Sequence, residues 1–381
     1  MLVTIAGILS VLAWLYLLLG RGGFWRVSRH FPALLPKSKS PSRIAVIIPA
    51  RNEAGVIGKS ISSLINQTGD HAIHIFLVDD DSSDGTAERA RLAANQASKS
   101  LSLTIIEGAT LPAGWTGKLW AVQQGIAQAR EWQPDFFLLT DADILHASNN
   151  IATLVSIAEN SSYDLASFMV KLQCQTAAEK LLIPAFVFFF FELYPPAWIS
   201  NSGNRTAGAA GGSILVRPEA LENAGGIEAI QNEIIDDCAL ARIVKQNGSK
   251  VWLGMSAKTV SLRPYKTFTE MDRMISRTAF SQLNHSTLRL LLALVGMALI
   301  YAAPPFLLFT RQWFAFQLGL SAWLLMTCCY LPMVRFYFLN PLWALTLPLA
   351  AVFYMAATFH SAIKYWSGRG GEWKGRSQDR G

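Results

Sequence analysis

The stretch IAVIIPARNE, residues 44–53, indicates the fold of the middle of the chain, because a short apolar run is followed there directly by a polar loop. Similar apolar runs recur at 73–78 (IHIFLV), 103–106 (LTII) and 136–140 (FFLLT). Runs of this length are typical of strands buried on both faces of a sheet. Helical stretches are predicted between them, near 56–66, 86–97 and 118–131. Strands and helices that alternate at this spacing predict an α/β domain over residues 42–265, with a mostly parallel, Rossmann-like sheet.

Residues 2–19, LVTIAGILSVLAWLYLLL, carry no charge and are long enough to cross a hydrocarbon core. A cleaved signal peptide would have a basic start and a small-residue cleavage site, whereas here the basic cluster follows the apolar run. We therefore expect a retained transmembrane anchor over 1–20, with its amino end outside. The other predicted regions are a basic linker at 21–41, an amphipathic connector at 266–286, membrane helices at 287–363 and a basic tail at 364–381.

Residues 181–200, LLIPAFVFFFFELYPPAWIS, interrupt the α/β pattern. The apolar run is short, contains Glu192 and ends in Pro195-Pro196. These features favour a helix that lies in the membrane interface over a helix that spans it. A buried core helix is the alternative.

Three apolar stretches follow the α/β region, at 287–309, 313–334 and 340–362, and Pro304-Pro305 and Pro332 interrupt them. Three full spans that leave the cytoplasm would place the basic tail outside, against the positive-inside rule. Either one stretch is re-entrant or the rule fails here, and both alternatives stay open.

The whole chain is short of charge: 51% of its residues are hydrophobic, 15% are charged and its mean hydropathy is +0.29. Ordinary globular domains carry about 25% charged residues, so much of this chain does not face water. The formal net charge is +7, and the segment from Arg21 to Arg43 holds six basic residues and no acid. Basic clusters beside apolar runs are typical of cytoplasmic juxtamembrane segments, and this placement argues against nucleic-acid binding.

The four cysteines, Cys174, Cys238, Cys328 and Cys329, lack metal-ligand spacing. An adjacent pair inside an apolar run does not make a disulfide framework either. Reduced thiols agree with a cytoplasmic location for the α/β domain.

Two polar loops follow the first two predicted strands. The first loop is Pro49-Ala50-Arg51-Asn52-Glu53, and its polar groups can hydrogen-bond a nucleoside base and ribose. The second loop is VDDDSSDGT (78–86), in which the carboxylates of Asp79 and Asp80 can accept from a uracil N–H or a ribose hydroxyl. A turn followed by a helix cap explains both loops equally well, and Asp84 is expected to cap the next helix. A calcium loop counted from Asp80 is excluded, because its twelfth position is Arg91 where a bidentate carboxylate is required.

Asp141 and Asp143 follow the fourth predicted strand in the sequence Leu139-Thr140-Asp141-Ala142-Asp143. Ligands of parallel sheets bind at the carboxyl ends of strands. Two carboxylates one residue apart at such an end can hold Mg²⁺ or Mn²⁺, which in turn grips a diphosphate by its oxygens. The metal then serves as a Lewis acid for a departing nucleoside diphosphate.

A fourth acidic group, Asp236-Asp237, stands at the predicted start of an amphipathic helix whose apolar positions include Ile235, Leu240 and Ile243. Carboxylates are stabilised as anions at a helix amino end. One that faces the cleft could take a proton from an attacking hydroxyl, whereas helix capping is the alternative role for either residue.

Together these motifs resemble the family 2 glycosyltransferases with the GT-A fold. VIIPARNE (46–53), VDDDSSDGT (78–86), TDAD (140–143) and DDCAL (236–240) match the family's signatures in order, over about residues 42–265. The resemblance implies a sheet domain that binds a nucleotide sugar, with transmembrane helices at both ends of the chain.

Carried over by motif, the resemblance assigns Pro49, Arg51, Glu53, Asp79 and Asp80 to the nucleoside end of the donor. It places Asp141 near ribose and metal, makes Asp143 a metal ligand and makes Asp237 the general base. The family's second motif usually has Gly at the position of Asp81, and we expect the turn to be kept here.

A narrower resemblance concerns Gly114-Trp115-Thr116-Gly117-Lys118, the apolar run 181–200 and the segment AGGSILVR (210–217). These are similar to the hopene-associated glycosyltransferases, bacterial relatives of the ceramide glucosyltransferases. Lys118 could then reach the donor phosphate as a point charge, or be a solvated lysine at a helix start. The small residues of 207–213 could let an acceptor approach the backbone, or form a tight loop.

The chain departs from the processive synthases and ceramide enzymes, which carry Q/R-x-x-R-W before their last spans. Here the nearest candidate is Arg277, and the tryptophan that stacks on an acceptor sugar is missing. The departure favours a single transfer over chain extension.

The sequence thus predicts a membrane-bound inverting glycosyltransferase of the bacterial inner membrane. Its catalytic domain is expected in the cytoplasm, its donor is a nucleotide sugar (a UDP-sugar) and its cofactor is Mg²⁺ or Mn²⁺. Its acceptor is expected to be a lipid of the bilayer, and the narrower resemblance implies a hopanoid-related lipid. A nucleotidyltransferase and a non-catalytic membrane scaffold with a retained nucleotide-sugar site are the alternatives. A dinucleotide-dependent oxidoreductase is disfavoured because the first strand runs into PARNE instead of G-x-G-x-x-G.

Overall fold

The computed structural model describes residues 1–32, 38, 40–96, 102–368, 372–373 and 376–377. They form two compact units, each assembled from separate parts of the chain. The sheet unit takes its described residues from 30–172, 198–263 and 372–381, and the helical unit takes its residues from 1–29, 173–197 and 264–371. Each unit is described by itself.

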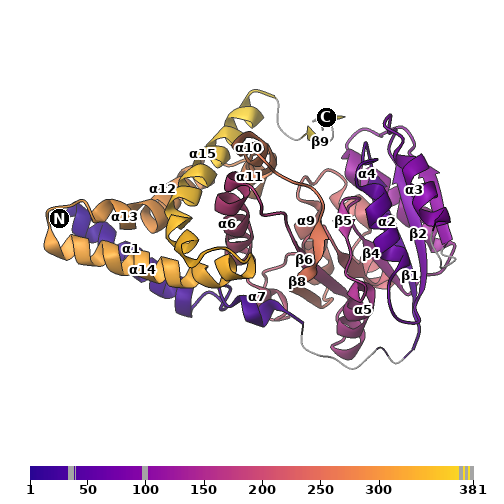
Figure 1. Cartoon of the computed structure of the whole chain (residues 1–381), viewed down its shortest axis with the longest axis horizontal. Coiled ribbons are helices and arrows are strands. Elements are labelled where there is room, and N and C mark those ends of the chain that lie inside the picture. The colour runs from indigo at the N-terminus through magenta and orange to yellow at the C-terminus, as the bar shows by residue number, and fades with distance from the viewer. Residues whose placement is uncertain (33–37, 39, 97–101, 369–371, 374–375, 378–381) are drawn as a thin grey trace. The chain divides into compact units, whose positions relative to one another are not determined.

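The sheet unit contains a mixed sheet whose described strands lie in the order β3-β2-β1-β4-β7-β6-β8-β5 (Figure 1). Their bounds are β1 Arg43–Ala50, β2 Ala72–Asp79, β3 Ser102–Glu107, β4 Phe136–Leu139, β5 Ile144–Leu145, β6 Leu165–Lys171, β7 Ile214–Val216 and β8 Val251–Ser261. A short antiparallel pair joins β9 (Glu372–Trp373) to β10 (Arg376–Ser377).

Helices connect the strands of this unit, and those at 57–65, 86–95 and 117–130 lie at the predicted places, whereas those at 150–160 and 218–223 were not predicted. The helices are α2 Ile57–Ile65, α3 Thr86–Asn95, α4 Gly117–Arg130, α5 Asn150–Asn160, α8 Pro218–Asn223 and α9 Asp236–Gln246, with a 3₁₀ turn η2 at Ile227–Ile230. Two short elements lie at the unit's boundaries, η1 at Val27–His30 and α7 at Pro196–Ile199.

Strand pairing confirms the predicted α/β fold and adds one feature. β3, β2, β1 and β4 are parallel, as the alternating pattern indicates, and β6 is parallel to β8. β7 runs antiparallel to both of its neighbours, β4 and β6. The sheet is therefore mixed, with β7 inserted beside the strand that precedes the D-x-D motif.

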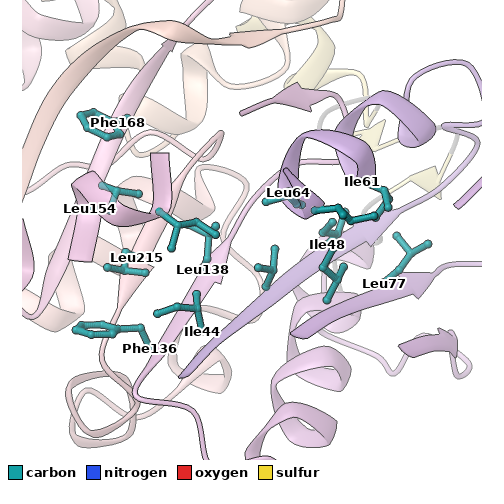
Figure 2. Packing of buried hydrophobic residues seen from close by; sticks show 14 of the residues in the cluster. Ile44, Ile48, Ile61, Leu64, Leu77, Phe136, Leu138, Leu154, Phe168 and Leu215 are labelled. Atoms are coloured by element: carbon teal, nitrogen blue, oxygen red, sulfur yellow. The ribbon is translucent and has the colours of Figure 1, made fainter. Parts of the chain in front are cut away.

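Two helices cover one face of the sheet around β1. Ile44 and Ile48 of β1 belong to one buried cluster with Ile61 and Leu64 of α2 and Leu154 of α5 (Figure 2). The intervening side chains of a strand point to the opposite face. Both faces of β1 are thus buried, which explains the uninterrupted apolar run in the sequence.

Helix α4 covers the opposite face of β1 at very short range. A Cβ placed on Gly125 of α4 would lie 2.7 Å from Cγ2 of Ile47 and 3.1 Å from Cγ2 of Val78. No side chain larger than hydrogen fits there without movement, so Gly125 sets the distance between α4 and the sheet.

The helical unit contains the chain's apolar helices. Their bounds are α1 Leu2–Leu19, α6 Ala177–Leu193, α10 Phe268–Ser276, α11 Ala279–Gln282, α12 Thr287–Met297, a π-helical turn η3 at Ala298–Ala302, α13 Ala303–Leu307, α14 Trp313–Phe336, a 3₁₀ turn η4 at Pro341–Thr346 and α15 Leu347–Trp366. Within the described residues, five helices are long and apolar enough to cross a membrane: 2–19, 177–199, 287–307, 313–336 and 341–366. One of these helices lies near the N-terminus and three lie in the C-terminal part of the chain, as the sequence predicts.

Three features of this unit refine the sequence-based expectations. The segment 173–197, which includes most of the predicted interfacial helix, is grouped with the helical unit, and Phe188 of α6 packs edge-on against Phe24 and Tyr330. Pro332 lies inside α14 and does not end it. Pro304 follows the π-helical turn, where the backbone hydrogen-bond pattern already changes.

Parts of two predicted basic segments lie outside the described residues. They are Lys37 and Lys39 of the linker and Arg369, Lys374 and Arg380 of the tail.

Candidate active site

The loops after β1 and β2 leave the sheet at the same level, because Ala50 pairs with Asp79 in parallel register. Arg51 of the first loop donates from Nη1 to the main-chain oxygen of Asp80 at 2.5 Å and lies 3.4 Å from its carboxylate Oδ2. Asp80 is buried, with 2% of its surface exposed. The buried Nε–H of Arg51 has no hydrogen-bond partner among the described residues. This loop therefore has an N–H donor that a ligand can bind.

Further contacts fasten these two loops to each other. The Asn52 N–H donates to Ser82 Oγ at 3.0 Å, and the Glu53 N–H donates to Thr86 Oγ1 at 2.8 Å. Asp84 accepts from the N–H and hydroxyl of Thr86, at 3.1 and 2.6 Å, but the N-cap residue of α3 is Gly85, so Asp84 supports the start of the helix from the position before the expected cap.

Asp81 keeps the turn that the family usually builds with glycine. Its φ is +56°, in the left-handed region that favours glycine and is tolerated by aspartate. Asp79 supports the same turn, because its Oδ1 accepts from the Ser82 N–H at 3.1 Å.

Lys118 holds two acidic motifs together. Its Nζ lies 2.9 Å from Asp141 Oδ1 and 2.9 Å from Asp236 Oδ2. Desolvation opposes the charge on Lys118, but the two carboxylates outweigh it and keep the pKa above its ordinary value. Lys118 is therefore a paired cation between the D-x-D turn and the start of α9, and the solvated-lysine alternative does not hold.

Asp237 lies next to this ion-paired group. Its Oδ2 accepts from the Gly211 N–H at 2.9 Å and its Oδ1 accepts from the Cys238 N–H at 2.7 Å. Desolvation and, after it, repulsion by Asp236 raise the pKa of Asp237 to about 6, against the attraction of Lys118 and the two N–H donors. Its pKa lies close to neutrality, where a general base works best.

The same groups line a hollow in the sheet unit. Its charged lining consists of Lys118, Asp141, Asp236 and Asp237, and Pro49 lies on its wall. Gly211 also lines it, and a Cβ there would lie 3.5 Å from both Asp237 Oδ2 and Lys118 Nζ. The small-residue run of 207–213 thus keeps space open between the charged groups.

Asp143 is held on the other side of the D-x-D turn. Its Oδ2 accepts from Ser261 Oγ at 3.1 Å and from Arg263 Nε at 3.2 Å, and Arg263 Nη2 lies 2.6 Å from Glu53 Oε1. Arg263 was not predicted as a site residue, because no motif surrounds it and 120 residues separate it from Asp143. Its position directly after β8, at a strand's carboxyl end, is the one signal that could have identified it.

A buried hydrogen-bond network holds the D-x-D turn in place through Thr140, the residue before Asp141. Asn150 Nδ2 lies 3.1 Å from His146 Nδ1, His146 Nε2 lies 3.1 Å from Thr140 Oγ1, and Thr140 donates to the Gly212 oxygen at 2.7 Å. Burial lowers the pKa of His146 to about 3, so the ring is neutral. With Nδ1 accepting from the amide, Nε2 carries the proton and donates to Thr140. The network ties the turn to the loop that contains Gly211.

The structure thus brings the predicted residues together in three groups. The first group, in the two paired loops, consists of Arg51, Asp79 and Asp80. The second group is held by Arg263, which pairs with both Glu53 and Asp143. The third group lines the hollow and consists of Lys118, Asp141, Asp237 and Pro49. Arg277, the nearest candidate for the arginine of the missing Q/R-x-x-R-W motif, lies in the helical unit at the end of α10. Within the described residues, no three His, Cys, Asp or Glu side chains are placed to hold a metal by themselves.

Comparisons with known proteins agree with this fold. The family model described as "Glycosyl transferase family 2" matches residues 45–215. Among solved structures, the chain is similar to the mannosyltransferase PcManGT from Pyrobaculum calidifontis in complex with GDP-Man and Mn²⁺, with 18% identity, a TM-score of 0.55, and coverage of 96% of this chain and 99% of that one.

A weaker likeness is found to TarS 1-349 of S. aureus in complex with UDP, with 14% identity, a TM-score of 0.41, and coverage of 86% of this chain and 92% of that one. No curated protein matches the chain. Residues 45–215 thus match the glycosyl transferase family 2 model, and the mixed sheet and the similarity to the mannosyltransferase structure show a GT-A fold.

Proposed function

We propose that the sheet unit catalyses transfer of a sugar from a nucleotide sugar to a hydroxyl of a lipid, with inversion at the anomeric carbon. The observation that carries the proposal is Asp237, a carboxylate with a pKa near 6 on the wall of a hollow that it shares with the D-x-D residue Asp141. Asp236 and Asp141 form ion pairs with Lys118. Asp237 forms no such direct pair with Lys118, so it is the carboxylate of this group best suited to accept a proton.

In the proposed reaction Asp237 takes the proton of the acceptor hydroxyl. The hydroxyl oxygen forms a bond to the anomeric carbon while the bond from that carbon to the diphosphate oxygen breaks. The nucleoside diphosphate leaves with the bonding electrons. One in-line displacement inverts the anomeric centre, and Lys118 supplies positive charge beside the reacting groups.

In the structure Asp141 pairs with Lys118 and Asp143 pairs with Arg263, and the carboxylate oxygens of both residues are the kind of ligand that a divalent cation prefers. Asp141 and Asp143 offer two carboxylates, and Mg²⁺ or Mn²⁺ is commonly held by one or two carboxylates together with substrate phosphates. We propose that these two residues hold the metal, which supplies Lewis-acid stabilisation of the leaving diphosphate. The similar mannosyltransferase, which carries GDP-Man and Mn²⁺, supports this class of donor and metal.

We further propose that the acceptor is a membrane lipid, and that transfer occurs at the cytoplasmic face of a bacterial inner membrane. Five helices long and apolar enough to cross a membrane support a membrane location. The basic residues Arg21, Arg26 and Arg29 directly after α1 support the cytoplasmic side. The hopanoid-related lipid rests on the sequence resemblance alone.

The proposal is tested by turnover of UDP-, GDP- and dTDP-sugars by the detergent-purified chain with a bacterial lipid extract, with and without Mn²⁺ or Mg²⁺. We expect metal-dependent transfer from one donor, lost in Asp143→Ala. Asp135→Ala is the matched control, because Asp135 lies at the opposite end of β4 and caps the Arg43 N–H.

Two outcomes contradict the proposal. Release of diphosphate from a nucleoside triphosphate, with a diphosphate-linked product, would identify a nucleotidyltransferase. Nucleotide binding without turnover across the panel would identify a non-catalytic scaffold.

A further inference from the structure

Arg263 connects two loops that belong to different ends of the proposed donor site. Its Nη2 lies 2.6 Å from Glu53 Oε1, in the loop after β1, and its Nε lies 3.2 Å from Asp143 Oδ2, in the turn after β4. One planar guanidinium therefore reaches both carboxylates with two of its donor groups.

The position of Asp143 has supports other than this ion pair. Ser261 donates to the Asp143 carboxylate at 3.1 Å, and the Leu262 N–H donates to the Asp143 main-chain oxygen at 2.7 Å. Both contacts come from the end of β8 and its next residue, so the strand end holds the D-x-D turn in place. These two contacts hold Asp143 independently of Arg263.

Arg263 is also more exposed to solvent than the two carboxylates it pairs with. The side chains of Glu53 and Asp143 are 12% and 11% exposed, whereas the side chain of Arg263 is 37% exposed. Two desolvated carboxylates require a nearby cation. The cation that the structure provides is also the member of the group most accessible to a ligand.

We propose that Arg263 binds the diphosphate of the donor, an inference that rests on the proposed function. Glu53 belongs to the loop proposed for the nucleoside and Asp143 to the turn proposed for the metal, and a nucleotide sugar carries its diphosphate between these two ends. The guanidinium that spans both carboxylates therefore lies where phosphate oxygens arrive. Its fork of N–H donors matches two phosphate oxygens.

The test compares binding of a nucleoside diphosphate with binding of its nucleoside, measured by titration calorimetry on the full chain in detergent with Mn²⁺. UDP with uridine and GDP with guanosine are the probes. We expect Arg263→Gln to weaken diphosphate binding by roughly 10- to 100-fold, the effect of losing charged hydrogen bonds, and to leave nucleoside binding within about twofold. Arg263→Lys keeps the charge without the fork and should fall between wild type and Arg263→Gln.

Arg242→Gln is the matched control, because Arg242 also pairs with a carboxylate of the sheet unit, Glu233, and is 49% exposed. Unchanged diphosphate binding in Arg263→Gln overturns the inference. So does an equal loss of diphosphate and nucleoside binding, since Arg263 would then act only by placing Glu53. A wild-type chain that binds no nucleotide at all overturns the proposed function itself, and with it this inference.

Discussion

Asp237 is surrounded by groups that act on its charge in opposite directions. Desolvation and Asp236 favour the protonated form, whereas Lys118 and the N–H groups of Gly211 and Cys238 favour the anion. The balance leaves the carboxylate neutral below about pH 6 and ionised above it. A residue in this state is able to accept a proton at neutral pH and return it to solvent after the reaction.

This balance predicts the pH dependence of transfer. A base must be deprotonated, so the pKa of about 6 predicts that the rate falls about tenfold for each pH unit below 6 and is level above it. The measurement is kcat/KM of the full chain from pH 4.5 to 8, because kcat/KM reports the pKa values of the free enzyme. In Asp236→Asn the like charge is removed, so the midpoint should move to lower pH. A rate that stays level down to pH 4.5 would contradict the role of Asp237.

Gly211 allows a separate test of the hollow. A Cβ at this position lies 3.5 Å from Asp237 Oδ2 and 3.7 Å from Asp141 Oδ2, distances of ordinary contact. Gly211→Ala should therefore fold with a thermal midpoint close to that of wild type, but lower transfer at least tenfold by filling space between the charged groups. Wild-type turnover in this variant would show that substrate does not pass over Gly211.

Sequence reasoning located the acidic residues of the site but not their partners. Asp79, Asp80, Asp141, Asp143 and Asp237 stand in motifs whose spacing can be read directly. The cation that pairs with Asp143 is Arg263, and the ring beneath the D-x-D turn is His146. Neither partnership could be predicted, because each depends on how strands distant in sequence come together.

At the scale of elements, burial on both faces explains why β1 and β4 were predictable. β3 was found by the same apolar pattern, but it lies at the edge of the sheet and is only half-buried, so the expectation of burial on both faces was wrong for this strand. Each of the strands β1 to β4 is a continuous apolar run, and the observed bounds differ from the predicted ones by one or two residues. β7 was not predicted as a separate strand, because it has only three residues and follows a run of small ones. Its antiparallel direction follows from long-range pairing with β4 and β6, which local pattern does not encode.

The close contact of α4 with β1 gives a prediction about stability. Gly125→Ala places a Cβ 2.7 Å from Ile47, so we expect it to lower the free energy of unfolding by about 1–3 kcal/mol, as overpacked cores do. Gly58→Ala in α2 is the control, because the nearest atom to its Cβ is 3.9 Å away and alanine is the better helix former. Thermal unfolding of the full chain, followed by circular dichroism, compares the two. A Gly125→Ala midpoint at or above that of Gly58→Ala would contradict the packing described.

At the scale of the whole molecule, each unit is built from separate segments of the chain. Residues 1–29, 173–197 and 264–371 contribute to the helical unit, so the chain leaves the sheet unit after β6 and returns before β7. The sequence marked the apolar segments by composition, but it did not show that α6 groups with the terminal helices. That grouping depends on aromatic contacts such as Phe188 with Tyr330, which are absent from any local pattern.

The proposed orientation can be tested by labelling the membrane-bound chain. Glu131, exposed after α4 in the sheet unit, is replaced by cysteine in a chain whose native cysteines are serine. A membrane-impermeant maleimide should label Glu131→Cys only after the cells are opened, because the sheet unit is proposed to lie in the cytoplasm. Labelling in intact cells would place it outside.

The central claim is that Asp237 removes the acceptor proton in the full membrane-bound chain, and Asp237→Asn tests it most directly. With the donor and lipid identified by the substrate panel, transfer by this variant is measured beside Glu233→Gln, a nearby carboxylate paired with Arg242. The account predicts that Asp237→Asn loses transfer by at least 10³-fold while its affinity for the nucleoside diphosphate stays within about threefold of wild type. Near-normal turnover in Asp237→Asn would contradict the assignment of the base.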